Sequence, residues 1–155
     1  CSYGAPFTVF DYVYTHTDGK FMLSTDYPYV GYKQTCKYDV SKAVGTLKDI
    51  VSIELADEND LALKCETYGP VAASIDGSHA SFQLYSSGIY DDPKCDELNV
   101  NLYLAIVGFG IEGETEYWIV RNCWGESWGE EGYIRMIKGM NNLCGYATSS
   151  CLPVS

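Results

Sequence analysis

The sequence predicts an α+β fold in which a helix precedes a mainly antiparallel sheet. Two observations support this class. Apolar residues within 6–16 recur at the three- and four-residue spacing of an amphipathic helix, whereas residues 70–137 contain alternating runs typical of strands. The chain has 155 residues, a usual size for one globular domain, and no repeat, low-complexity tract or Pro/Ser linker divides it.

Residues 6–16 form the first expected helix. Its apolar face is made of Phe7, Phe10, Val13 and Tyr14. The segment His16-Thr17-Asp18-Gly19 is a turn signal and should end the helix. Because Pro28 disfavours helical backbone in the residue before it, residues 26–31 are expected to form an extended loop.

The next elements follow from local signals. A strand is expected around residues 45–55. Asp57 is a helix-capping residue, and the helix that it begins should place Leu61, Cys65 and Tyr68 on one face before Gly69-Pro70 ends it. Four strands should follow, separated by turns that contain Gly113 and Gly129. They are expected at residues 71–76, 104–110, 117–122 and 133–138.

Charge and hydropathy exclude two classes of partner. Ten basic and twenty-one acidic residues give a net charge of -11 and a pI near 4.4. This negative field repels phosphates, so we expect no nucleic-acid partner. The longest apolar run, residues 102–111, is too short to cross a bilayer, so no membrane span is expected. The clustered carboxylates are interpreted as a solvated face.

Seven cysteines are more than a typical cytosolic chain carries, and their odd number leaves at least one unpaired. None forms a C-x-x-C pair or lies near a histidine, so neither a metal site nor another cofactor is expected. Disulfides in an oxidising compartment are the better interpretation, and the spacing leaves their pairing open. The chain begins at Cys1 without a signal-peptide pattern, so we expect a processed or partial product.

Several motifs follow one another along the chain. They lie in residues 1–6, 27–29 with Cys36, 69–72, 81–90, 117–125, 128–134 and 142–145. In this order they resemble the papain-like cysteine peptidases of the cathepsin L-like type. Residues 1–6 are similar to the family's Cys-x-Gly-Gly segment, which lines the substrate groove, and residues 117–125 to the segment that carries its catalytic asparagine.

The resemblance implies the carboxy-terminal part of a papain-like fold. Residues 1–44 would be a remnant of the helical domain, and residues 45–155 would form the antiparallel β-barrel-like domain. It also implies a disulfide between Cys95 and Cys144. Cys1 and Cys36 match cysteines whose family partners lie further towards the amino terminus. They would be free, paired with each other, or paired with a segment outside this chain.

Two departures from the family decide the expected function. The nucleophilic cysteine of the family precedes the segment at which this chain begins. The family's histidine lies six residues before a Gly-Tyr-Gly turn, which here starts at Gly108, so Leu102 occupies its position. The only histidines are His16 and His79. Asn122 matches the asparagine that orients the family's histidine, and we expect its role to be vestigial.

We therefore expect a catalytically inactive homologue, a pseudopeptidase with a binding or structural role. The alternative is a processed or incompletely represented cysteine endopeptidase. A remnant of the groove could still bind a peptide, although a side chain at Tyr3 would crowd it. The resemblance assigns this remnant to Tyr3, Gly4, Ala5, Pro6, Ser74, Val100, Asn101, Trp124 and Ser149.

Two expectations concern the surroundings of the chain. Another protein, or the missing amino-terminal segment, should cover residues 1–16. Family habit suggests a lysosome-like or secreted location, and an intracellular one if the chain serves as a structural protein.

Cys123 stands where the family usually has serine. A relocated nucleophile and a small residue that fills a tight strand position are both open, and the second is favoured. The three tryptophans are expected to pack in the core.

Overall fold

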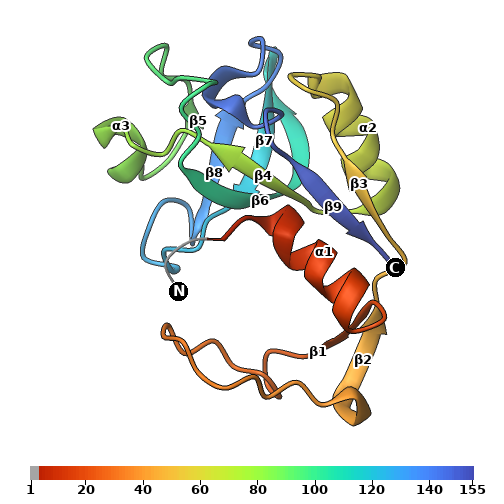
Figure 1. The fold of residues 1–155 in the computed structure, drawn as a ribbon. Helices are drawn as coiled ribbons and strands as arrows, with labels where there is room; N and C mark the ends of the chain where they lie inside the picture. The colour runs from red at the N-terminus through yellow and green to blue at the C-terminus, as the bar shows by residue number, and fades with distance from the viewer. Residues whose placement is uncertain (1–3) are drawn as a thin grey trace. The chain divides into compact units, whose positions relative to one another are not determined.

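A computed structural model describes residues 4–155, and the chain divides into two compact units. The first comprises residues up to Val51 together with Pro153–Ser155, and the second comprises Ser52–Leu152. Figure 1 shows the elements of both along the chain. The expected division between residues 44 and 45 concerns the family's domains and stays a prediction. Here strand β2, Ala43–Thr46, spans that point and pairs within the first unit.

The first unit begins with α1, Pro6–His16, whose bounds match the expected helix. Pro6 occupies the first turn, where its missing N–H costs nothing. The helix ends where the Thr17 hydroxyl and the Gly19 N–H both donate to the carbonyl oxygen of Val13, at 2.7 and 3.0 Å. Gly19 has φ +71°, a conformation that glycine adopts without strain. The expected stop signal is thus confirmed.

A two-stranded antiparallel sheet completes this unit. Strand β1, Lys20–Met22, pairs with β2, Ala43–Thr46, and a 3-10 helix, η1, Val40–Lys42, precedes β2. The single strand expected around residues 45–55 is therefore wrong, because β2 ends at Thr46 and a separate strand, β3, runs from Asp49 to Ser52. The break lies at Leu47, whose side chain is buried and whose N–H donates to the Gly19 carbonyl.

The second unit opens with α2, Glu58–Tyr68. The Asp57 carboxylate accepts hydrogen bonds from the backbone N–H groups of Asn59 and Asp60 at 2.8 and 3.0 Å, which confirms the expected cap. Leu61 and Cys65 are buried, as expected. Tyr68 is not on that buried face, since it is 51% exposed at the last turn.

A seven-stranded sheet follows, in the order β3-β9-β4-β6-β7-β8-β5. Its central strands pair antiparallel, whereas β5 and β8 run parallel. The order has two edges, so the sheet is open and is not a closed barrel. The strands not yet bounded are β4 Val71–Ile75, β5 Ile89–Tyr90, β6 Leu102–Glu112, β7 Thr115–Arg121, β8 Tyr133–Ile137 and β9 Cys151–Val154.

Alternation along the strands builds the core. Trp118 and Val120 of β7 are buried, as are Ile134 and Met136 of the neighbouring β8. α2 packs beside β6 and β4. These elements confirm the α+β class and the strands expected near residues 71, 104, 117 and 133. The short elements α3, Ala80–Gln83, and η2, Leu143–Gly145, were not expected, nor were β1, β5 and β9. No helix in the described part of the chain is long and apolar enough to span a membrane.

Candidate functional site

Leu102 and Asn122 lie at the same end of the sheet. Leu102 is the first residue of β6, and Asn122 directly follows β7. The two strands are antiparallel, with Ala105 opposite Arg121, so the start of β6 meets the end of β7. The pairing of β6 with β7 thus places Leu102, at the position that the resemblance assigns to the family's base, near Asn122.

The Leu102 side chain is half-buried and lies against Gly77. A Cβ atom added at Gly77 would stand 2.8 Å from Leu102 Cδ2, so the leucine occupies the space that the glycine leaves open. An aliphatic side chain neither accepts a proton nor stabilises a thiolate. This position is therefore filled by packing and offers no acid–base chemistry.

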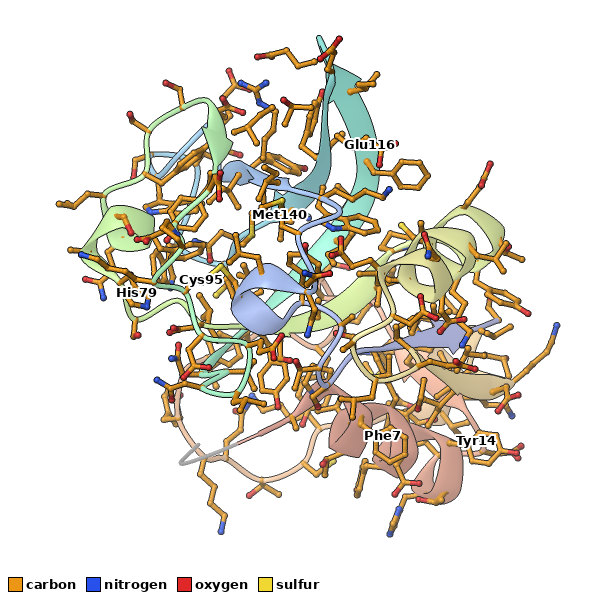
Figure 2. The ribbon with its side chains drawn as sticks, turned by 90° about the horizontal axis from the view of Figure 1, so that it is seen from above. Phe7, Tyr14, His79, Cys95, Glu116 and Met140 are labelled. Atoms are coloured by element: carbon orange, nitrogen blue, oxygen red, sulfur yellow. A yellow bond between two sulfur atoms is a disulfide. The ribbon has the colours of Figure 1, made fainter. Side chains whose placement is uncertain are left out.

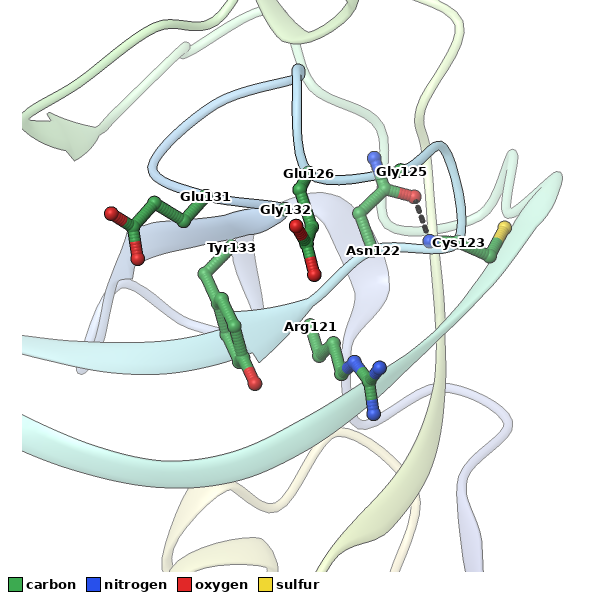
Figure 3. A pocket seen from close by; sticks show the side chains of 8 residues that line it. All are labelled: Arg121, Asn122, Cys123, Gly125, Glu126, Glu131, Gly132 and Tyr133. Carbon is green, nitrogen blue, oxygen red and sulfur yellow. Dashed lines mark hydrogen bonds between the residues drawn. The ribbon is translucent and has the colours of Figure 1, made fainter.

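Asn122 has an unusual hydrogen-bonding state. Its side chain is 7% exposed, and its Oδ1 accepts a hydrogen bond from the backbone N–H of Cys123 at 2.7 Å (Figure 3). Its Nδ2 is buried and has no hydrogen-bond partner among the described residues. A buried donor left unpaired costs about 1–3 kcal/mol. The unpaired Nδ2 can therefore still donate a hydrogen bond to an oxygen or nitrogen lone pair.

Two expectations about neighbours of Asn122 are wrong. Cys123 does not fill a tight strand position, because its thiol is exposed. Trp124 is 41% exposed, although Trp118 is buried as expected. Alternation explains the exposure of Cys123, because β7 turns Trp118, Val120 and Asn122 inward and the residue after Asn122 points outward. Trp124 lies beyond the end of β7 at Arg121, where alternation no longer applies.

The aromatic side chains around Trp124 form a cluster at this edge. The ring of Trp124 makes edge contacts with Phe82 and Trp128, with centroids 5.5 and 5.4 Å apart. The indole N–H of Trp128 donates to the carbonyl oxygen of Gln83 at 3.0 Å. One face of Trp124 thus rests on packed rings, while the rest of it is open to solvent.

The other expected groove residues fall in both units. Gly4, Ala5 and Pro6 lie at the start of α1 in the first unit, and Tyr3 lies outside the described residues. In the second unit Ser74 is buried in β4, and its hydroxyl has no partner among the described residues. Val100 is half-buried, and Ser149 is exposed. Asn101 is engaged in a hydrogen-bond network of its own.

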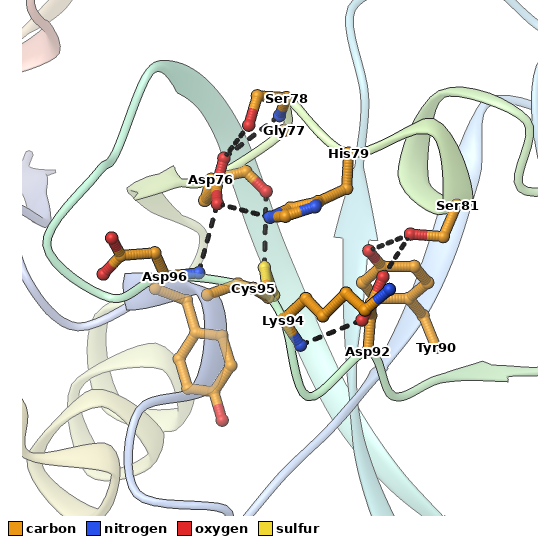
Figure 4. The surroundings of a disulfide bond; sticks show 12 residues. Asp76, Gly77, Ser78, His79, Ser81, Tyr90, Asp92, Lys94, Cys95 and Asp96 are labelled. Atoms are coloured by element: carbon orange, nitrogen blue, oxygen red, sulfur yellow. Dashed lines mark hydrogen bonds and ion pairs between the residues drawn. A yellow bond between two sulfur atoms is a disulfide. The ribbon is translucent and has the colours of Figure 1, made fainter.

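That network centres on Asp76, which sequence reasoning did not identify. Its buried carboxylate accepts hydrogen bonds from the backbone N–H groups of Ser78 and Asp96 and from the side chains of Ser78 and Asn101. The His79 ring completes the set, with Nε2 2.9 Å from Asp76 Oδ2 (Figure 4). His79 directly precedes α3, Ala80–Gln83, and its ring anchors this carboxylate.

The electrostatics of Asp76 follow from these contacts. Burial by itself raises the pKa of the carboxyl, but the hydrogen bonds from Ser78, Asn101 and the Asp96 N–H outweigh it and hold the pKa well below its usual range. Asp76 therefore stays ionised through the whole physiological range. It is a structural anion that fixes the loop after β4 to the loop before β6.

The disulfide lies beside the same carboxylate. Cys95 and Cys144 are bonded, with Cα atoms 4.8 Å apart, which confirms the pairing that the resemblance implied. The backbone N–H of Asp76 donates to the Cys144 carbonyl at 2.9 Å. Figure 2 shows Cys95 and His79 in the same region of the molecule. Cys1 lies outside the described residues, and Cys36 is exposed and has no disulfide partner among residues 4–155.

Other polar groups that could form a site are mostly paired. Arg135 binds Glu112 and Glu130, and Lys138 binds Glu116, so the acidic face interpreted as solvated is partly neutralised. Within residues 4–155, no group of three or more His, Cys, Asp or Glu side chains is placed to hold a metal ion.

Comparison with known proteins identifies the family. The family model described as papain family cysteine protease matches residues 1–154. The chain belongs to the papain family of cysteine proteases. This papain-family chain is 41% identical over 141 residues to cathepsin L of Sarcophaga peregrina. The match covers 90% of the chain and 42% of that protein. It is 38% identical over 158 residues to testin-2 of Mus musculus, which covers 99% of the chain and 46% of that protein.

A solved structure supports the same assignment. Digestive procathepsin L 3 of the Tenebrio molitor larval midgut superposes with a TM-score of 0.88 at 35% identity, over 98% of this chain and 49% of that one. The papain-family chain thus spans less than half the length of these relatives. The fold that the sequence indicated, a carboxy-terminal part of a papain-like α+β structure, is confirmed.

Proposed function

We propose that this papain-family chain is a peptidase homologue without peptidase activity, and that it binds or supports another polypeptide. The observation that carries the proposal is Leu102, an aliphatic residue at the position assigned to the base. In cysteine peptidases the thiolate attacks the peptide, while an imidazole stabilises that ion and then protonates the leaving amine. General acid–base catalysis is commonly worth ~10²–10⁴-fold in rate.

The state of Asn122 supports the proposal. An asparagine that orients a histidine uses its side-chain amide for that purpose. In this chain the Oδ1 is turned to the adjacent backbone N–H, and the Nδ2 has no partner among the described residues. We interpret Asn122 as vestigial with respect to catalysis. The groove residues Ser74, Val100, Asn101 and Trp124 could still contact a bound peptide.

An exposed apolar surface supports a macromolecular partner. No residue of α1 is buried, and Phe7 and Tyr14, labelled in Figure 2, are 50% and 51% exposed. An apolar cavity of about 260 Å³ opens in the same unit, lined by Val9, Phe10, Val13, Phe21, Leu47 and Pro153. Large apolar patches on soluble proteins mark interaction sites. We propose that another protein, or an amino-terminal segment of the same gene product, fills it.

A second candidate function is cysteine endopeptidase activity in proteolysis. Its support is the 41% identity to a cathepsin L of which the chain covers only 42%, so a nucleophile could be supplied by sequence that is not in this chain. Both candidates share a lysosome-like or secreted setting, for which the Cys95–Cys144 disulfide is the supporting feature.

The experiment that separates them is an assay with a fluorogenic dipeptidyl substrate and a thiol-reactive epoxide. The chain is tested alone and joined to the nucleophile-bearing half of a close relative. We expect no turnover from the joined protein with Leu102, and measurable turnover from its Leu102→His variant. Leu102→Gln is the matched control, since glutamine is polar and of similar size but cannot act as a base.

Turnover by the joined protein with Leu102 in place, abolished by the epoxide, would overturn the proposal and establish the endopeptidase. Activity in Leu102→Gln equal to that in Leu102→His would show that packing at this position, rather than the missing base, limits the reaction.

A further inference from the structure

The connection between β1 and β2 contains a segment whose composition differs from that of the rest of the chain. Residues 27–38, here called the tyrosine loop, contain four tyrosines and two lysines and no acidic residue, although the whole chain has a net charge of -11. The loop contains no helix or strand and runs as irregular chain between the two strands (Figure 1). Its side chains are therefore not selected by the packing of a regular element.

The tyrosine loop folds around an open cavity of about 350 Å³, whose wall is made of residues 27–34. Gly31 lies in the middle of this wall with φ +72°, a conformation that glycine adopts without strain and that lets the chain turn. Tyr29 and Tyr32, on either side of the turn, both line the cavity and are 90% and 65% exposed. Two aromatic rings are thus available to a molecule that enters the cavity.

The same loop has free hydrogen-bonding groups. The backbone of residues 28–38 makes no hydrogen bond to other backbone groups within residues 4–155. One contact ties the loop together: the backbone N–H of Lys37 donates to the hydroxyl oxygen of Tyr27 at 3.2 Å. Tyr27 acts there as an acceptor, so its own O–H is free to donate. The peptide groups and this hydroxyl can bond a ligand that carries many hydroxyl groups.

The charge of the loop indicates an acidic ligand. Lys33 lines the cavity, and both Lys33 and Lys37 are exposed and form no ion pair with any residue that the structure describes. Asp26 and Asp39 flank the loop, and the Asp39 carboxylate is bonded within its own turn. The loop is thus a cationic spot on an acidic protein. Since the field of the whole chain repels densely charged polyanions, the ligand should carry only sparse negative charge.

We propose that the tyrosine loop binds an acidic oligosaccharide, a sugar chain in which some of the rings carry a carboxylate. The rings of Tyr29 and Tyr32 pack against the apolar faces of the sugars, and Lys33 binds the carboxylate. The free peptide groups and the Tyr27 hydroxyl bond the sugar hydroxyl groups. A membrane surface is disfavoured, because membrane-binding segments present a continuous apolar face, whereas this loop is concave and its aromatic side chains all carry a hydroxyl group.

The test compares two probes by titration calorimetry on the purified chain. One is a hyaluronan hexasaccharide, with a carboxylate on every second ring, and the other is the neutral hexasaccharide of N-acetylglucosamine. We expect hyaluronan to bind about five-fold more tightly, as one charge contact at about 4 Å in water allows. Lys33→Gln should remove that difference and leave the affinity for the neutral probe unchanged. Tyr29→Ala and Tyr32→Ala should each weaken both probes by roughly two- to ten-fold, the range for one aromatic contact.

Two variants outside the loop are the matched controls. Lys48→Gln removes an exposed lysine of the same unit, and Tyr68→Ala removes an exposed tyrosine of α2. Both should leave the two affinities unchanged.

Three results would overturn the proposal. The first is no saturable binding of hyaluronan, and the second is equal affinity for the acidic and the neutral probe. The third is binding to phosphatidylserine vesicles without binding to either hexasaccharide, which would assign the loop to a membrane surface. None of these measurements depends on peptidase activity or on a partner at α1, so this inference and the proposed function fail separately.

Discussion

Replacing Asp76 by asparagine tests the main electrostatic element of the structure. The change keeps the shape of the side chain and removes its charge. In the native chain both carboxylate oxygens accept hydrogen bonds, Oδ1 from Ser78 and Asn101, and Oδ2 from His79 and the Asp96 N–H. The Nδ2 of an asparagine would face at least one of these donors and could not accept from it.

The expected loss is large because the carboxylate is buried. Hydrogen bonds to charged groups are worth about 1.5–3 kcal/mol each, and a donor left unpaired in the interior costs about 1–3 kcal/mol. Removing one partner of a buried ionic network costs about 3–5 kcal/mol in total. The free energy of unfolding of a domain is only about 5–15 kcal/mol. We expect Asp76→Asn to lower it by about 3–5 kcal/mol.

The measurement is urea unfolding followed by tryptophan fluorescence with the disulfide intact. Asp91→Asn is the matched control, because Asp91 is exposed in the same segment, and its replacement should change the free energy of unfolding by less than about 0.5 kcal/mol. An Asp76→Asn protein as stable as Asp91→Asn would refute the argument that this carboxylate holds the loops together.

The pH dependence supplies an independent check with a definite sign. The folded state lowers the pKa of Asp76, so the ionised form stabilises the fold at any pH above the unfolded value of about 3.9. That contribution is lost as the pH falls through the lower pKa of the folded state. The stability difference between native protein and Asp76→Asn should therefore be constant from neutral pH down to about 4 and shrink below it.

Two further predictions concern the disulfide and α1. Reducing Cys95–Cys144, which are 49 residues apart, should lower the free energy of unfolding by about 4 kcal/mol, measured by urea titration with and without reductant; a loss below about 1 kcal/mol would contradict the loop-entropy argument. Phe10→Asp, in the apolar cavity of the first unit, should abolish partner binding in sedimentation or pull-down against an identified partner. Thr8→Asp on the same exposed helix should leave that binding intact, and equal binding by Phe10→Asp would place the interface elsewhere.

The elements that could be predicted from sequence are those with local signals. Both long helices were bounded by residues within one turn of their ends, Pro6 and Gly19 for α1 and Asp57 and Gly69 for α2. The short strands β5 and β9 could not be predicted from sequence, because each exists only through pairing with a strand distant in the chain. The 45–55 strand failed for the same reason: two partners divide it at Leu47.

The site shows a similar limit. Leu102 could be located only through the resemblance, by counting back six residues from Gly108 as the spacing in the family implies. Asp76 could not, because its donors come from positions up to 25 residues away and are brought together only by the fold. The exposure of the Cys123 side chain, by contrast, could be predicted from sequence. Extending the alternation of β7 by two residues beyond Arg121 places the thiol outside.

The distribution of charge differs between the two units of this papain-family chain. The first unit contains five lysines and five aspartates and is neutral, whereas Ser52–Leu152 contains five basic and sixteen acidic residues and carries the whole net charge of -11. The apolar cavity beside α1 therefore lies in a unit with no net field, and binding there rests on buried apolar surface, which salt does not screen.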